Sequence, residues 1–156
     1  MPASLDDLFA ASPYLRELHA RDGAWLARAL SEPDHELENV LLDVDGAGKL
    51  ASDEETVGRE LRTAKGRVAL LAAAAETSGR WTTAQSTAAL SDLADAALDA
   101  GLAVLLRRAA EKGDVIAGTT PERSGLALFA LGKHGGRELN YSSDIDIVAF
   151  FDRSAG

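Results

Sequence analysis

Two short apolar runs, separated by a polar, glycine-rich loop, are the feature that most constrains the fold of this chain. Residues 126–131 (LALFAL) have the length of a buried strand rather than that of a helix. Residues 143–151 (SDIDIVAFF) form a second run, rich in the Ile, Val and Phe that strands favour. From Ile147 onward both faces of this run are apolar, which is typical of a strand covered on both sides. The stretch therefore predicts a strand, a loop and a second strand.

Two carboxylates, Asp144 and Asp146, stand at the start of the second predicted strand. Side chains at i and i+2 of a strand point to the same face, roughly 7 Å apart along the chain. Repulsion between two such carboxylates favours a divalent cation as counter-charge, and Mg²⁺ binds both carboxylate and phosphate oxygens. We therefore expect Asp144 and Asp146 to be metal ligands.

The loop before these aspartates has the composition of a phosphate-binding turn. Gly135, Gly136 and Arg137 offer backbone N–H groups that a phosphate can approach closely, because no Cβ stands in the way at the glycines. Lys133 adds positive charge, and Ser143 stands beside the first aspartate. A glycine turn followed by a D-x-D strand is the arrangement that metal-assisted nucleotidyl transfer needs.

The same loop does not fit the other common phosphate motifs. A P-loop requires glycine five residues before the Gly-Lys pair and Ser or Thr after it. Here these positions hold Ala127 and His134. The chain contains no G-x-G-x-x-G sequence either.

Residues 132–148 (GKHGGRELNYSSDIDIV) resemble the signature of the glutamine synthetase adenylyltransferase/adenylyl-removing family, which belongs to the DNA polymerase β-like nucleotidyltransferase superfamily. The resemblance implies that Asp144 and Asp146 are catalytic Mg²⁺ ligands. It also implies that the Gly135-Gly136-Arg137 turn lies against nucleotide phosphates. His134 departs from the family pattern, since an apolar residue such as Leu is expected there.

Enzymes of this family have two related halves, and the resemblance predicts which half this is. One half removes AMP from a tyrosine of glutamine synthetase by phosphorolysis and forms ADP; the other adds AMP from ATP. The motif here follows a start Met and a long, mostly helical stretch, which resembles the N-terminal, adenylyl-removing half. Implied partners are glutamine synthetase, ATP or ADP, phosphate and a PII signalling protein.

The superfamily takes a third carboxylate from a later strand, so we expect the front of a longer enzyme whose 156 residues are inactive alone. Two other functions stay open. One is a different D-x-D nucleotidyltransferase, such as a PII uridylyltransferase or a small antitoxin-like transferase. The other is a non-catalytic helical module that only docks on a partner.

The predicted fold class is α+β: a mostly helical region over residues 1–114, then the first strands of an incomplete polymerase β-like nucleotidyltransferase sheet over residues 115–156. The chain is 46% hydrophobic but only 5% aromatic, and its many Ala and Leu residues favour helices. Ser12-Pro13 marks one helix start. Further helices are expected at about 53–76 and 83–111, the latter ending near Gly113.

Several local features lead to narrower expectations. Asp34 is expected to cap a short helix, residues 45–48 (DGAG) to form a flexible break, and Ser52 with Glu55 to form a capping box. Trp25 is expected in the core, and His19 and His35 on the surface. A basic stripe (Arg59, Arg62, Lys65 and Arg67) and an acidic set (Asp92, Asp95 and Asp99) are interpreted as solvated helix faces, although the basic stripe also suits an anionic ligand, the nucleotide domain or glutamine synthetase.

The charge and composition exclude several classes of partner. A net charge of −9 disfavours a broad surface for nucleic acid or for an anionic membrane. Without cysteine there is neither a disulfide framework nor a thiolate zinc site. Asp6 and Asp7 stand where a signal peptide needs positive charge, and no apolar run approaches 18 residues. We expect a cytoplasmic protein without a membrane segment.

Overall fold

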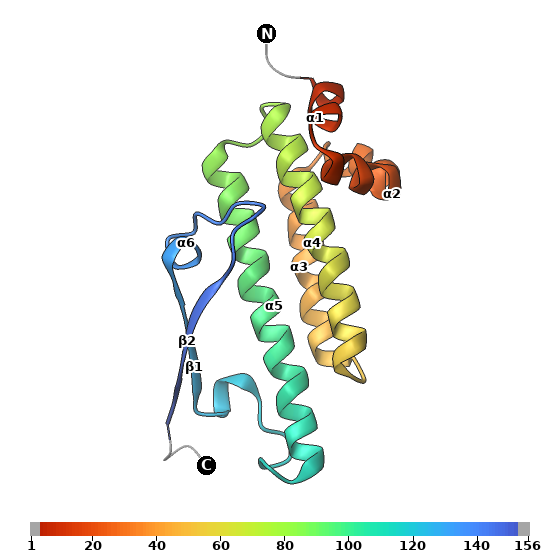
Figure 1. Cartoon of the computed structure of the whole chain (residues 1–156). Helices are drawn as coiled ribbons and strands as arrows, with labels where there is room; N and C mark the ends of the chain where they lie inside the picture. Colours follow the sequence, from red (N-terminus) through yellow and green to blue (C-terminus); the bar gives the residue numbers. More distant parts are fainter. Residues whose placement is uncertain (1–3, 153–156) are drawn as a thin grey trace.

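The computed structural model describes residues 4–152, which form a helical bundle with a two-stranded hairpin at its side (Figure 1). This arrangement confirms the predicted α+β class. Within the described residues, no helix is long and apolar enough to cross a membrane. The predicted boundary between a helical region (1–114) and a nucleotidyltransferase region (115–156) stays a prediction. Residues 1–3 and 153–156 of these two regions lie outside the described residues. The elements in chain order are α1 (Leu5–Ala11), α2 (Pro13–Ala29), α3 (Pro33–Leu50), α4 (Glu54–Thr77), α5 (Thr83–Lys112), the 3-10 turn η1 (Pro121–Arg123), β1 (Leu126–Leu131), α6 (Gly132–Gly135) and β2 (Asp146–Phe151).

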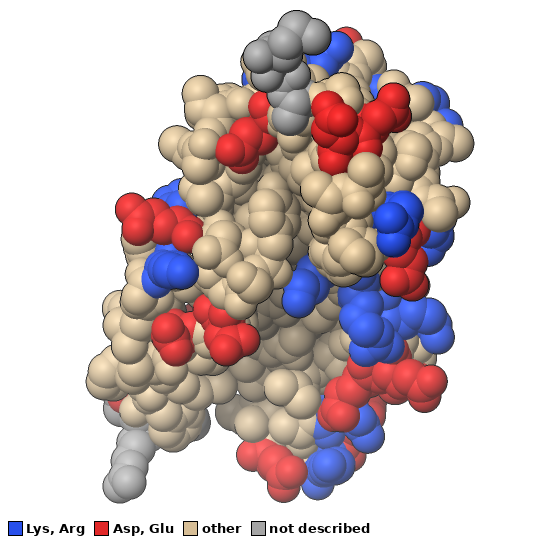
Figure 2. Space-filling model, turned by 45° about the horizontal axis from the view of Figure 1, so that its top comes forward, with Lys and Arg blue, Asp and Glu red and all other residues tan. Residues whose placement is uncertain are grey.

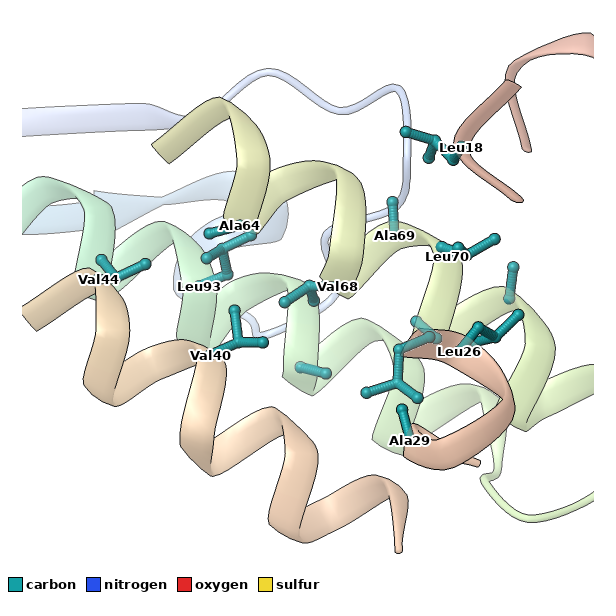
Figure 3. Close-up of a cluster of buried hydrophobic side chains, with 14 of the residues drawn as sticks. Leu18, Leu26, Ala29, Val40, Val44, Ala64, Val68, Ala69, Leu70 and Leu93 are labelled. Atoms are coloured by element: carbon teal, nitrogen blue, oxygen red, sulfur yellow. The ribbon is translucent and has the colours of Figure 1, made fainter. Parts of the chain in front are cut away.

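The central helix of the bundle is α4, which packs against α2, α3 and α5. Residues 68–75 of α4 (VALLAAAA) are all buried, so this part of the helix is enclosed on every side. Its alanines have small side chains, which allows the neighbouring helices to approach closely. Figure 3 shows Val40 of α3 and Leu93 of α5 near Val68 of α4, and Leu26 of α2 farther along α4. This core fixes the relative positions of α4 and α5, the helices that the candidate site contacts.

The sequence predicted several helix boundaries correctly because their signals are local. The Ser12 side chain accepts a hydrogen bond from the Leu15 backbone N–H at 3.3 Å, and Pro13 occupies the first turn of α2. Gly113, with φ of 80°, ends α5 in the left-handed conformation that glycine adopts at low cost. The predicted ranges of α4 and α5 agree with the structure to within a residue or so.

Two predicted caps are wrong. Glu32 occupies the N-cap position of α3, so Asp34 lies inside the first turn, where it accepts a hydrogen bond from the Trp81 indole N–H at 3.0 Å. At the start of α4, the Asp53 side chain accepts from the Thr56 backbone N–H at 2.7 Å and takes the role predicted for Ser52. At α4 a neighbouring side chain therefore replaces the predicted cap, whereas the Glu32 side chain makes no capping hydrogen bond at α3.

The predicted flexible break at residues 45–48 is also wrong, because α3 continues through it. Gly48 is buried, and a Cβ added there would lie 2.6 Å from the Ala100 Cα in α5. The missing side chain therefore permits a close crossing of two helices. The Arg107 guanidinium of α5 donates to the carbonyl oxygens of Gly48 at 2.6 Å and Ala51 at 2.8 Å, which satisfies groups that the end of α3 leaves unpaired.

Side chains expected in the core or on the surface lie where they were predicted. Trp25 is half-buried and packs against the core, with the Arg67 guanidinium carbon 5.3 Å from the centre of its ring. His19 and His35 are both exposed. His19 also stacks on Phe9, with ring centres 4.1 Å apart.

The hairpin pairs β1 with β2 in antiparallel register, so that Leu131 lies opposite Asp146. The bounds of β1 are as predicted, whereas β2 begins only at Asp146 and residues 143–145 belong to the loop. The expectation that both faces of the second strand are covered is wrong for the described residues. Every residue of β2 is exposed, Phe150 and Phe151 each by 60%, because the sheet in this part of the chain has two strands and no second layer over β2.

Candidate functional site

The loop between β1 and β2 carries most of the predicted site residues and lies against the helical bundle (Figure 1). Its first residues form the short helix α6, which contains Lys133 and ends at Gly135. Leu139, in the middle of the loop, is only 4% exposed and lines the same cavity as side chains of α4 and α5. The position of the loop therefore depends on the helices that precede it in the sequence.

Gly132 brings the Asp146 carboxylate to the start of this loop. It has a φ of 56°, and a Cβ added to it would lie 3.0 Å from Asp146 Oδ2. A side chain at this position would be strained by the backbone and would crowd the carboxylate. The sequence alone does not reveal the role of Gly132, because the register that places it beside Asp146 exists only once β1 and β2 are paired.

The Gly135-Gly136-Arg137 turn is closed by hydrogen bonds of its own. The backbone N–H of Gly136 donates to the Gly132 carbonyl at 3.0 Å, and that of Arg137 donates to the His134 carbonyl at 3.0 Å. Two of the amides expected to meet phosphate are thus already bonded within the turn. Arg137 has a φ of 57° and is the described non-glycine residue with positive φ. Phosphate contact at Gly135, Gly136 and Arg137 stays a prediction.

The two adjacent glycines of the turn differ in how much space surrounds them. A Cβ on Gly135 would lie 2.5 Å from the Ala130 carbonyl oxygen, whereas on Gly136 the nearest atom would be 3.5 Å away. We expect Gly135→Ala to destabilise the chain by about 1–2 kcal/mol, because the turn must move away from β1. Gly136→Ala, the matched control, should change stability by less than about 0.5 kcal/mol. Urea unfolding of the two variants measures both, and equal losses would contradict this packing.

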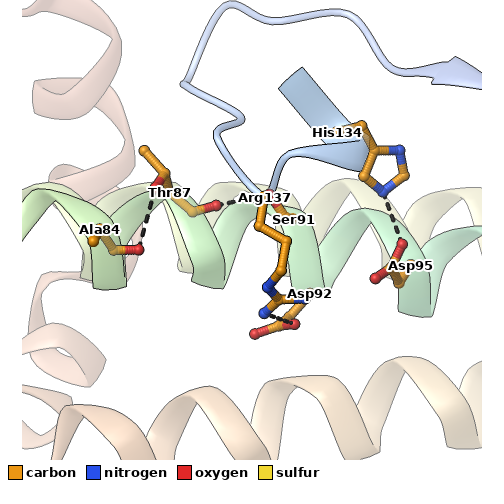
Figure 4. Close-up of polar contacts among 7 residues, drawn as sticks. All are labelled: Ala84, Thr87, Ser91, Asp92, Asp95, His134 and Arg137. Carbon is orange, nitrogen blue, oxygen red and sulfur yellow. Dashed lines mark hydrogen bonds and ion pairs between the residues drawn. The ribbon is translucent and has the colours of Figure 1, made fainter. Parts of the chain in front are cut away.

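The interpretation of the acidic set on α5 as a solvated face is wrong, because Asp92 and Asp95 hold the loop (Figure 4). Arg137 donates to Asp92 at 2.5 Å, and His134 Nε2 bonds Asp95 Oδ1 at 2.8 Å. Asp92 raises the pKa of the Arg137 guanidinium, chiefly through this hydrogen bond. The third member, Asp99, has its pKa raised mainly by desolvation and then by Asp95. Two of the three aspartates are thus engaged by the loop, and the absence of a metal site on this face stays a prediction.

His134, the departure from the family pattern, is buried to 3% exposure and uses Asp95 as its partner. Asp95→Ala should cost about 1–2 kcal/mol of stability, because it leaves the buried imidazole Nε2 without a partner. His134→Leu should cost less than about 1 kcal/mol, since an apolar side chain needs no partner and the exposed Asp95 carboxylate is solvated by water. Thermal unfolding of both single variants and of the double variant checks this. A double variant that is less stable than Asp95→Ala would contradict it.

Ser143 closes a second turn just before the aspartates. Its hydroxyl donates to Asn140 Oδ1 at 2.9 Å and accepts from the Asn140 backbone N–H at 3.2 Å. Asn140 Oδ1 also accepts from the Ser142 backbone N–H at 3.1 Å, which makes an Asx-type turn. Ser143 therefore shapes the approach to Asp144, and its predicted contact with phosphate stays a prediction.

A cavity of about 480 Å³ lies between this loop and the bundle. Asp144 lines it from the loop, while Arg62 and Lys65, two members of the basic stripe, line it from α4. Figure 2 shows Lys and Arg side chains at the rim of a hollow on one face of the molecule. The other two members are engaged elsewhere, Arg59 with Glu60 at 3.9 Å and Arg67 with Asp22 at 3.8 Å.

Tyr141 also lines the cavity, and its surroundings fix its protonation state. Desolvation, with a smaller contribution from the charge of Glu76, raises the pKa of the Tyr141 phenol to about 12. The hydroxyl is therefore neutral at physiological pH and is a poor candidate for a general base.

Comparison with known proteins identifies the family. The model of the family described as glutamate-ammonia ligase adenylyltransferase matches residues 3–156. The chain belongs to this family. The match extends over the helices as well as the loop, so the helical bundle is part of the family's architecture and not an unrelated attachment.

Three curated relatives of this adenylyltransferase-family chain are much longer proteins. Each is named a bifunctional glutamine synthetase adenylyltransferase/adenylyl-removing enzyme. That of Bradyrhizobium diazoefficiens is 41% identical over 148 residues, 92% of this chain and 15% of the relative. That of Xanthobacter autotrophicus is 42% identical over 146 residues, 91% of this chain and 15% of the relative. That of Caulobacter vibrioides is 42% identical over 154 residues, 95% of this chain and 15% of the relative. The chain thus spans about 15% of the length of these proteins. No solved structure matches it.

Proposed function

We propose that this chain is part of an enzyme that transfers adenylyl groups on glutamine synthetase, and that its site serves the removal of AMP by phosphorolysis. The observation that carries the proposal is that one cavity has both Asp144 and the cations Arg62 and Lys65 in its walls. In a reaction between two phosphate groups, the negative charges of the phosphates repel each other, and this repulsion must be offset by positive charge. A metal ion held by a carboxylate, together with two cationic side chains, would supply that charge.

Asp144 and Asp146 fit a hard cation such as Mg²⁺. Both are exposed, and within residues 4–152 neither makes an ion pair, so their oxygens are available. Two carboxylates leave most positions of an octahedral ion to water and phosphate oxygens, as Mg²⁺ prefers. When bound, Mg²⁺ would supply charge stabilisation at the phosphorus centre.

The direction of the reaction is supported by the absence of an evident base among the described cavity residues. In phosphorolysis an oxygen of inorganic phosphate forms a bond to the AMP phosphorus, and the bond from that phosphorus to the tyrosyl oxygen breaks. The tyrosyl oxygen leaves with the electron pair and takes up the proton that hydrogenphosphate carried, which gives ADP and free tyrosine. The nucleophile is already ionised, so no side chain has to remove a proton from it. Arg62 and Lys65 would bind and orient anionic groups.

The experiment measures the release of AMP groups from adenylylated glutamine synthetase in Mg²⁺ and phosphate. It compares the 156-residue chain with a chimaera in which this chain replaces the matching 154 residues of the Caulobacter vibrioides relative. We expect ADP from the chimaera and none from the chain alone, because among the described residues no third metal-ligating side chain is grouped with Asp144 and Asp146. A chimaera that incorporates AMP but has lost its phosphate-dependent release of ADP would overturn the assignment to removal. A PII regulatory partner and a cytoplasmic location are further expectations of the family resemblance.

A further inference from the structure

The cavity beside Asp144 has an apolar floor that the proposed function has not yet used. We propose that it binds the modified residue of the protein substrate, a tyrosine side chain whose oxygen carries the phosphodiester. The aromatic ring would enter the floor, and the phosphate would lie at the rim beside Arg62 and Lys65. This inference rests on the proposed function and names the substrate group that the site accepts.

The size and lining of the cavity suit one aromatic ring with its attached phosphate. A volume of about 480 Å³ lies within the range of small-ligand sites. The helices supply a floor that consists only of aliphatic side chains, while Tyr14 and Tyr141 add aromatic surface at the edges. The floor residues are Leu61, Ala69, Leu90, Leu93, Ala94, Ala97 and Leu98.

The charges at the rim are complementary to a phosphodiester. Arg62 and Lys65 are three residues apart on α4, so they lie on the same helix face. Both are exposed, and within residues 4–152 neither makes an ion pair. The same two side chains line an adjoining groove of about 260 Å³ together with Arg21. With the Asp144 carboxylate in the opposite wall, the cavity lining carries two positive charges and one negative charge, a net charge of +1. In a chain of net charge −9, this local excess of positive charge favours an anionic ligand beside Arg62 and Lys65.

The distribution of polar groups favours a phenyl ring over a purine base. A buried purine needs hydrogen-bond partners in the plane of its ring, and the aliphatic floor offers none. Asn140 lines the cavity from the loop, but its Oδ1 already accepts from Ser142 and Ser143, which leaves only its side-chain N–H₂ group to bond a base. The ring of an esterified tyrosine has no polar atom apart from the ester oxygen, and that oxygen would lie at the rim with the phosphate.

The test measures binding to the isotope-labelled 156-residue chain by NMR and calorimetry, with phenyl phosphate, inorganic phosphate and AMP as probes. We expect phenyl phosphate to shift the signals of Leu93 and Ala97 and to bind more tightly than inorganic phosphate or AMP. The double variant Arg62→Gln/Lys65→Gln should weaken this binding at least tenfold. Arg59→Gln, on the same helix but outside the cavity lining, is the matched control and should bind as the unchanged chain does.

A second variant separates the ring from the phosphate. Ala97→Leu fills part of the floor, so it should weaken phenyl phosphate while leaving the weaker binding of inorganic phosphate unchanged. AMP that binds as tightly as phenyl phosphate at the same residues would overturn the inference in favour of a nucleotide site. Absence of phenyl phosphate binding would also overturn it. Because these measurements involve no turnover, their outcome is independent of whether the chimaera releases AMP.

Discussion

Asp146→Asn is expected to reduce phosphate-dependent release of AMP by the chimaera about a thousandfold. Asp146 is one of two proposed metal ligands, and its carboxylate lies beside the Gly132 turn. A bound metal ion contributes several kcal/mol to the stabilisation of a phosphoryl transition state, and about 4 kcal/mol corresponds to a factor of a thousand in rate. Initial rates of ADP formation at saturating Mg²⁺ measure the loss. Asp144→Asn should behave in the same way.

Neither substitution should harm the fold. Both carboxylates are exposed, and removal of one of two like charges relieves their repulsion in the metal-free protein. The thermal midpoint without Mg²⁺ should therefore stay the same or rise slightly. Asp114→Asn, an equally exposed position beyond the end of α5, is the control and should retain full activity. A variant at Asp146 that keeps more than a tenth of the activity, or that unfolds at a much lower temperature without metal, would contradict the assignment of this residue to the metal.

The features that could be predicted from sequence are those whose cause lies within a few residues. The Ser12-Pro13 start of α2 and the Gly113 end of α5 are local capping signals. The apolar run of β1 likewise carries its own length and boundaries. The aspartate pair and the glycine turn were singled out because they stand in one short motif, and their roles stay predictions.

The features that sequence reasoning missed depend on contacts between distant segments. Arg137 and Asp92 are 45 residues apart, and His134 and Asp95 are 39 apart, so no local pattern links the loop to α5. The acidic set has the same appearance in sequence whether it meets water or the loop. Similarly, Arg62 and Lys65 become candidates for a ligand site only once Asp144 lines the same cavity.

The two glycines of α3 also differ in a way that only contacts between helices reveal. In the sequence Gly46 and Gly48 look alike, but in the structure their surroundings are different. Gly46 is half-buried, with no atom within 4 Å of an added Cβ, whereas the Cβ of a residue at position 48 would meet Ala100. A glycine inside a helix normally weakens it relative to alanine by about 1 kcal/mol. At Gly48 the lower helix propensity of glycine is offset by the close packing of α3 against α5, which a Cβ would prevent.

Gly48→Ala is therefore expected to lower the free energy of unfolding by about 2–3 kcal/mol, through overpacking between α3 and α5. Contact would be with backbone as well as side chain, since the added Cβ lies 2.6 Å from the Ala100 Cα and 2.8 Å from its Cβ. For a chain of this length, such a loss corresponds to a fall of about 4–12 °C in thermal midpoint. Calorimetry of the 156-residue chain measures it.

Gly46→Ala is the matched control and should change stability in the opposite direction, by about 0.5–1 kcal/mol, because it restores helix propensity without a clash. Both substitutions raise helix propensity equally, so a difference in stability between the Gly46→Ala and Gly48→Ala variants cannot come from helix propensity. If residues 45–48 were a flexible break, both variants would be close to neutral and neither would disturb α5. If Gly48→Ala lowers the stability and also weakens the hydrogen bonds from Arg107 to the end of α3, the crossing of α3 and α5 sets the position of α5. The crossing would then also position Asp92 and Asp95, the two α5 side chains that hold the loop of the candidate site.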